Sequence, residues 1–160
     1  MLSVDIICVG KLKEAYWRDA CQEYVKRLGA YCKIRILEVG EERLPDNPSP
    51  SQITATLEAE GQRILSLIPT SGTVMALCIE GKLCSSPDLA DYIQKQTVSG
   101  VSHLSLVIGG SWGLSPAVKK RADLRLSMSP MTFPHQLARV MVLEQLYRSF
   151  QITSGGKYHK

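Results

Sequence analysis

The chain has 160 residues, of which 44% are apolar and 21% are charged, a composition ordinary for one soluble globular domain that spans residues 1–160. No apolar run approaches the ~20 residues that cross a bilayer, and the first ten residues include an acid but no basic side chain. We therefore expect neither a membrane segment nor a signal peptide, and predict a cytoplasmic protein. The net charge of +4 is uneven, because residues 1–100 carry 11 basic and 13 acidic side chains whereas residues 101–160 carry 8 and 2.

Short apolar runs alternate along the chain with longer segments in which apolar residues recur every three to four positions. The runs are typical of strands and the longer segments are typical of amphipathic helices. The predicted strands span residues 4–9, 34–39, 73–79, 103–108 and 124–128. The predicted helices span residues 17–28, 50–68, 86–97, a short segment from 116, and 134–151. Five such units predict an α/β domain with a mostly parallel sheet and helices on both faces.

Serine-proline pairs mark three of the predicted helix starts, at Ser49-Pro50, Ser86-Pro87 and Ser115-Pro116. A serine side chain can cap the first free N–H groups of a helix, and proline suits the first helical position. The first helix is expected to end at Gly29, and the second to stop before Pro69.

Five cysteines occur at positions 8, 21, 32, 78 and 84, with no C-x-x-C pair. This odd number and irregular spacing favour neither a disulfide framework nor a metal site. Cys8, Cys21 and Cys78 lie on apolar runs or stripes and are predicted to be small core residues. The roles of Cys32 and Cys84 stay open.

Two loops in the last third of the chain each follow a predicted strand. The first is Gly109-Gly-Ser-Trp-Gly113, and the second, residues 129–133, leads directly into the last helix. Glycines allow close approach of backbone to a ligand, and a helix N-terminus offers free N–H groups. Ligands of parallel sheets bind beyond the carboxyl ends of the strands. With Leu77-Cys-Ile-Glu-Gly81 at a third strand end, these loops predict a cleft for an adenosine-containing ligand.

Two common nucleotide motifs are absent. The chain contains no G-x-x-x-x-G-K-[ST], and its first strand ends in a lone Gly10 rather than G-x-G-x-x-G, so neither a P-loop nor the dinucleotide fingerprint is present. The basic last third of the chain would attract a polyanion such as nucleic acid. A merely solvated basic surface is the alternative.

The last predicted helix carries an apolar stripe wider than one core-facing side requires. Its members are Leu137, Val140, Met141, Val142, Leu143, Leu146, Tyr147 and Phe150. Excess apolar surface on a terminal helix indicates a second copy of the chain as partner, and a wide core-facing stripe is the alternative. His135 and Arg139 are one turn apart, and we expect them to share the polar side at the helix start.

Several motifs together closely resemble the RlmH family of bacterial SPOUT methyltransferases, over the whole chain. They include Val107-Ile-Gly-Gly-Ser-Trp-Gly-Leu114, the run from Leu126 to Arg139, Glu144-Gln-Leu-Tyr-Arg148 and Lys157-Tyr-His-Lys160. The resemblance implies a SPOUT-type α/β knot, in which the C-terminal segment threads through a loop as a trefoil. It also implies methylation of N3 of a pseudouridine in 23S rRNA on the assembled ribosome, by homodimers that use S-adenosylmethionine.

The resemblance also implies which residues bind the cofactor. These are Leu77, Gly109, Met128, Ser129, Pro130, Met131, Thr132 and Phe133. The N3 proton must leave, so a general base would help. Candidates are His135 and, on the tail, Tyr158 or His159, which could reach the pocket of a partner subunit.

The sequence leaves the roles of several residues, and two other functions, open. Arg139 could hold an RNA phosphate or stabilise developing charge, and Trp112 or Tyr158 could stack on a base, although Trp112 could equally anchor the core. A non-catalytic nucleotide- or ribosome-binding module, or a SPOUT methyltransferase acting on tRNA, are the alternative functions.

Overall fold

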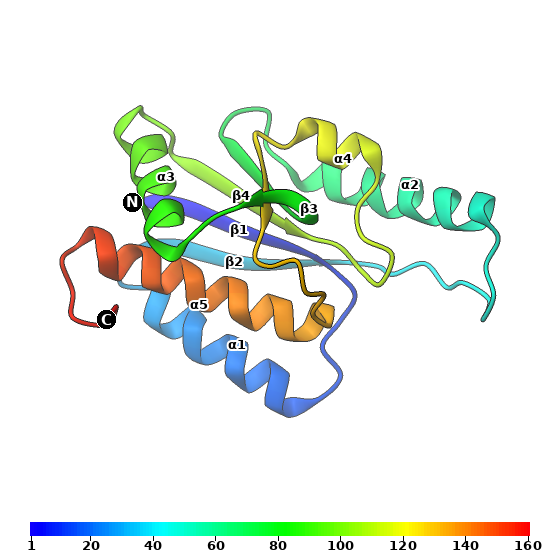
Figure 1. Ribbon diagram of the computed structural model, residues 1–160, viewed down its shortest axis with the longest axis horizontal. Coiled ribbons are helices and arrows are strands. Elements are labelled where there is room, and N and C mark those ends of the chain that lie inside the picture. The colour runs from blue at the N-terminus through cyan, green and yellow to red at the C-terminus, as the bar shows by residue number, and fades with distance from the viewer.

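Five parallel strands form one sheet in this computed structural model, which describes all 160 residues. The strands are β1 (Leu2–Val9), β2 (Cys32–Val39), β3 (Thr73–Leu83), β4 (His103–Ile108) and β5 (Leu124–Ser127), in the order β2-β1-β4-β3-β5. Every neighbouring pair is parallel. The predicted parallel α/β architecture is therefore confirmed (Figure 1).

Helices cover both faces of this sheet, as predicted. They are α1 (Ala15–Leu28), α2 (Pro50–Leu67), α3 (Ser86–Val98), α4 (Pro116–Arg121) and α5 (His135–Thr153). α5 lies between α1 and α3 on one face, whereas α2 and α4 pack together on the other (Figure 1). No helix combines the length and apolar character that a membrane crossing requires.

The cap residues largely agree with the sequence signals. Ser49 caps α2 in a reciprocal capping box with Gln52, and the Ser115 side chain caps α4. α3 differs by one residue, because Ser85 rather than Ser86 is the cap and forms a capping box with Asp88. A carboxylate three residues after a serine completes such a box, and Ser85 has this spacing to Asp88.

The third strand is longer than predicted. β3 continues past Gly81 to Leu83, and its second half pairs with β5 after a register shift, with Lys82 opposite Leu126. Gly81 permits this pairing because a Cβ there would lie only 2.7 Å from the Arg125 carbonyl oxygen. Because glycine has a low propensity for strands, the local sequence predicted that the strand ends before Gly81. Pairing with β5 extends the strand beyond this point.

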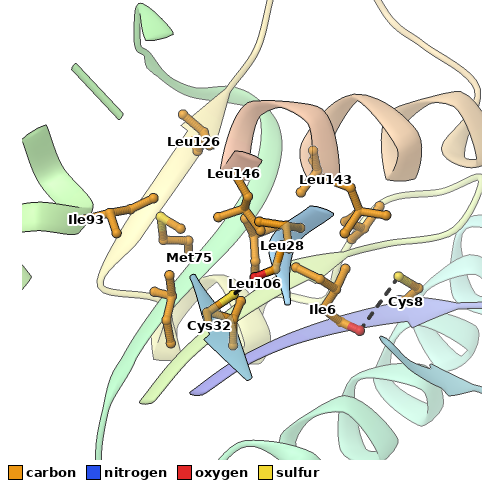
Figure 2. Packing of buried hydrophobic residues seen from close by; sticks show 14 of the residues in the cluster. Ile6, Cys8, Leu28, Cys32, Met75, Ile93, Leu106, Leu126, Leu143 and Leu146 are labelled. Atoms are coloured by element: carbon orange, nitrogen blue, oxygen red, sulfur yellow. Dashed lines mark hydrogen bonds between the residues drawn. The ribbon is translucent and has the colours of Figure 1, made fainter. Parts of the chain in front are cut away.

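Two apolar clusters fill the space between the helices and the sheet. The larger lies under α1, α3 and α5, and Figure 2 shows Leu143 and Leu146 of α5 meeting Leu28 and Met75 there. The smaller lies under α2 and α4, with Ile64 and Val118 among its members. Most residues of the wide apolar stripe on α5 therefore pack into the core.

The cysteines are free thiols. Cys8, Cys21 and Cys78 are buried in the two clusters, which confirms the prediction for them. Cys32 is buried as well, whereas Cys84 is half-buried. Burial raises the pKa of Cys8 to about 12 and that of Cys32 to about 11, so both thiols stay protonated at neutral pH. No group of three His, Cys, Asp or Glu side chains is arranged to hold a metal ion.

Asp5 is 1% exposed in the middle of β1 and is expected to give the fold a pH dependence. Burial raises its pKa, but hydrogen bonds from Arg35 (2.8 Å to each oxygen) and His103 (2.8 Å) outweigh burial and hold the pKa below its ordinary 3.8. Because the folded-state pKa is depressed, the stabilisation is complete above pH ~4 and is lost as pH falls further. Asp5→Asn should cost about 2 kcal/mol at pH 7.

Urea unfolding of wild type and Asp5→Asn between pH 7 and pH 3 checks this. The difference in unfolding free energy should shrink as pH falls below 4. Asp91→Asn is the matched control, since Asp91 forms an exposed ion pair with Lys95 and should cost little at any pH. A pH-independent difference for Asp5→Asn would contradict the role of its charge.

Candidate functional site

A pocket of about 810 Å³ opens where β4 and β5 end, beside the middle of β3. Its walls are residues 77–80 of β3, the glycine loop from Gly109 to Leu114 after β4, and the segment from Ser127 to the first turn of α5. All three lie at the carboxyl edge of the sheet, where the parallel topology leaves room for a ligand. The cleft predicted from the two loops and the third strand end is therefore present.

The glycine loop is closed on itself. The Gly113 N–H donates to the Gly110 carbonyl oxygen (3.1 Å), and Gly113 adopts a φ of +86°, which favours glycine. At Gly109 a Cβ would overlap the Gly113 carbonyl, a backbone group that cannot move aside. The loop can therefore take this shape only with glycine at its first position.

The second loop is held by its own serines. The Ser127 hydroxyl donates to the Ser129 carbonyl oxygen (3.2 Å), and the Met131 N–H donates to the Ser129 side chain (2.9 Å). No side chain caps α5, whose cap residue is Pro134. The first N–H groups of α5 thus remain available beside the pocket, because His135 at its start lines the wall.

Most residues expected to bind a cofactor lie around this pocket. The residues that line it are Leu77, Gly109, Met128, Ser129, Met131, Thr132 and Phe133. Pro130 is exposed and does not line the wall. Trp112 is 52% exposed and Met131 74% exposed at the rim, so Trp112 is not a core anchor.

One charged pair on the wall was missed by the sequence reasoning. The Lys119 ammonium of α4 donates to the Glu80 carboxylate of β3, and both residues line the pocket. This hydrogen bond lowers the pKa of Glu80, which therefore stays ionised. The signal that could have found the pair is position: Glu80 directly follows the apolar run 73–79, and α4 closely follows the glycine loop.

Arg139 does not lie where the helical spacing placed it. The residue is 2% exposed, and its guanidinium donates to the Glu38 carboxylate (2.7 Å) and to the Gly10 carbonyl oxygen (3.1 Å). His135 lines the pocket, so the expectation of a shared polar side was wrong. The reason is that this side of α5 packs on the ends of β1 and β2, where Glu38 compensates the buried charge.

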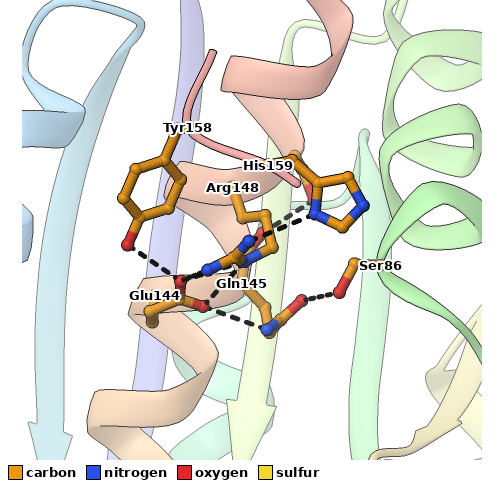
Figure 3. Close-up of polar contacts among 7 residues, drawn as sticks. Ser86, Glu144, Gln145, Arg148, Tyr158 and His159 are labelled. Atoms are coloured by element: carbon orange, nitrogen blue, oxygen red, sulfur yellow. Dashed lines mark hydrogen bonds and ion pairs between the residues drawn. The ribbon is translucent and has the colours of Figure 1, made fainter. Parts of the chain in front are cut away.

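The tail lies at the opposite end of α5 from the pocket. Figure 3 shows Tyr158 and His159 on a polar cluster, with the Tyr158 hydroxyl donating to Glu144 (3.1 Å) and His159 Nδ1 3.1 Å from the Arg148 guanidinium. Partial burial and the bond to Glu144 raise the pKa of Tyr158. From Arg148 to His135 the helix covers ~20 Å. The structure therefore does not bring Tyr158 and His159 to the pocket of the same chain.

Comparisons with known proteins agree with this architecture. The family model described as "Predicted SPOUT methyltransferase" matches residues 2–159. Proteins named ribosomal RNA large subunit methyltransferase H are similar over their whole length. The one from Oenococcus oeni is 49% identical over 160 residues, covering 100% of both chains. Those from Bifidobacterium adolescentis and Clostridium novyi are 50% and 48% identical over 159 residues, each covering 99% of this chain and 100% of the relative. The chain therefore belongs to the SPOUT methyltransferase family, in its RlmH group.

Proposed function

We propose that this protein methylates N3 of a pseudouridine in 23S rRNA on the assembled ribosome, with S-adenosylmethionine as methyl donor. The observation that carries the proposal is the pocket at the carboxyl ends of β4 and β5, built from the two loops that resemble the family motifs. The names of the full-length relatives support ribosomal RNA as the substrate class. We also propose that the protein is cytoplasmic and that its C-terminal segment forms a trefoil knot.

The residues around the pocket fit S-adenosylmethionine. A volume of about 810 Å³ suits a ligand of that size. Leu77, Met128 and Phe133 supply apolar walls for an adenine ring, and the loop backbones supply donors and acceptors for its polar edge. When bound, this group supplies a methyl already activated by its sulfonium.

The contribution of the chain is then chiefly positioning, because the methyl transfer is an in-line displacement. We assign to His135 the removal of the N3 proton, since it is the imidazole that lines the pocket. We assign to Arg139 the positioning of α5 rather than a contact with RNA. By binding Glu38 and the Gly10 carbonyl, it fixes the first turns of α5 against the sheet.

We also propose that the protein works as a homodimer. On α5, Leu137 and Met141 stay half-buried although their neighbours reach the core, which leaves apolar surface for a second copy. The tail cluster lies too far from the pocket of its own subunit, so Tyr158 and His159 can contribute to catalysis only at the pocket of the partner subunit. Trp112 lies at the rim of the pocket, and we assign to it stacking on the base that enters.

Tritium transfer tests the activity. Label from S-adenosylmethionine should pass to ribosomes from cells that lack this protein, and mass mapping should find one methyl on a pseudouridine of 23S rRNA. Cofactor binding without transfer would favour a non-catalytic binding module. Transfer to tRNA instead would overturn the substrate.

His135→Ala is expected to lower kcat by roughly a hundredfold or more, because removal of a general base costs about this much. The Kd for S-adenosylmethionine, measured by calorimetry, should change by less than about threefold, since the walls remain. Gln136→Ala, one residue on and outside the pocket lining, is the control and should retain activity. Equal losses in turnover and cofactor affinity for His135→Ala would show that the histidine is structural.

A further inference from the structure

Basic side chains gather at the β5 edge of the sheet, beside the pocket. The four residues are Lys119, Lys120, Arg121 and Arg125, and we call them the basic edge. Lys119 pairs with Glu80, and Arg121 with Asp123 at 3.7 Å. Lys120 and Arg125 have no carboxylate partner in the structure, and both are exposed.

The members of this group are held together by the fold. Lys119, Lys120 and Arg121 form the last turn of α4. Arg125 Nε donates to the Lys119 carbonyl oxygen (3.1 Å), which ties β5 to that turn. Lys82 does not belong to this group, because it pairs in register with Leu126 and therefore faces the side of α3 and α5, opposite to Arg125.

The basic edge borders the pocket directly. Lys119 belongs to both, since its side chain lines the pocket wall with Glu80 while its backbone carbonyl holds Arg125. A base that enters the pocket remains attached to its phosphates on either side. Those phosphates must lie close outside the rim, and unpaired ammonium and guanidinium groups are the side chains that bind them.

We propose that the basic edge binds the phosphate backbone of the rRNA segment that flanks the target base. This inference rests on the proposed function and adds a surface that the pocket alone does not specify. Lys120 and Arg125 make the principal contacts, because they are exposed and free of carboxylate partners. They would set the register of the RNA on the protein without reading its sequence.

Two other exposed lysines lie away from the basic edge. Lys33 lies on β2, the opposite edge of the sheet, and Lys95 lies in the last turn of α3, paired with Asp91. Neither lines the pocket. They therefore offer a charge-matched control pair on the same chain.

Binding of the full-length protein to large ribosomal subunits, from cells that lack it, tests the proposal across a range of salt concentrations. Lys120→Gln/Arg125→Gln should weaken binding roughly tenfold or more at low salt, and should reduce the slope of log affinity against log salt by about 1 for each phosphate no longer neutralised. KM for the subunits should rise in proportion, while kcat and the Kd for S-adenosylmethionine stay unchanged. Lys33→Gln/Lys95→Gln should match wild type.

The charge-keeping variant Lys120→Arg/Arg125→Lys should retain the wild-type slope, which separates charge from folding. An unchanged slope for the Gln pair, or an equal loss in the Lys33/Lys95 pair, overturns the proposal. Weaker binding to subunits with an unchanged salt slope would assign the edge to a ribosomal protein and also overturns it. Failure of the wild type to transfer methyl, with the binding differences intact, would instead count against the proposed function.

Discussion

Removal of residues 157–160 is expected to lower methyl transfer by roughly a hundredfold or more, because loss of groups that position the target base costs about this much. Dimerisation and cofactor affinity should be preserved, because the tail belongs to neither the pocket lining nor the buried clusters of its own subunit. The Glu144–Arg148 ion pair remains to satisfy the end of α5. Tritium transfer, sedimentation and calorimetry measure the three properties. Lys157→Gln/Lys160→Gln, which keeps Tyr158 and His159, should stay active.

Mixed dimers show which pocket the tail serves. A subunit without residues 157–160 keeps its pocket, and a Gly109→Ala subunit keeps its tail. If the tail of one subunit completes the pocket of the other, a mixture of the two impaired proteins should regain activity at cofactor concentrations well below the Kd of the Gly109→Ala pocket, with one working site in each mixed dimer. Full activity of the shortened protein would remove the tail from the site, and a mixture without activity would contradict its action across the dimer.

Gly109→Ala is expected to weaken S-adenosylmethionine binding tenfold to a hundredfold. The added Cβ would overlap the Gly113 carbonyl, so the loop must shift. Overpacking of this kind costs about 1–3 kcal/mol, and each 1.4 kcal/mol is tenfold in affinity. Calorimetric titration with the cofactor measures the change, and thermal unfolding checks that the fold persists.

Gly110→Ala is the matched control for this substitution. Gly110 also lines the pocket, but its Cβ would meet side chains alone, with Val9 nearest at 3.3 Å and Glu41 Oε1 at 4.0 Å, so that a shift of a few tenths of an ångström relieves the contact. Its cofactor affinity should therefore fall much less than that of Gly109→Ala. Equal affinities for the two variants would mean that backbone overlap does not shape the pocket.

The fold was predictable where local signals and tertiary packing agree. β4 matches its predicted bounds, and the proline-marked helix starts hold to within one residue. β3 fails the prediction because its last residues form a strand only through pairing with β5, which no local pattern encodes. Strand order is likewise set by long-range packing, so alternation of strands and helices predicted a parallel sheet without its order.

The sequence predicted the location of the candidate site better than it predicted the roles of the residues around it. Parallel topology brings strand ends to one edge, so the order of strands and loops along the chain was enough to place the two loops together. The same reasoning could not place Arg139, because its partner Glu38 is 101 residues distant in sequence and only the packing of α5 on β2 joins them. Glu80 and Lys119 come together in the same way, across 39 residues.

The place of α5 in the larger cluster has a consequence for how the chain folds during synthesis. Leu143 and Leu146, near the C-terminus, complete the cluster to which Val4 and Ile6 of the first strand belong. β1 also pairs with β4, so that Ser3 lies opposite His103. The contacts of β1 with β4 and α5 therefore cannot be complete until nearly the whole chain has been synthesised. We expect a nascent chain to stay incompletely folded until α5 has left the ribosome and then to fold as one slow, cooperative unit.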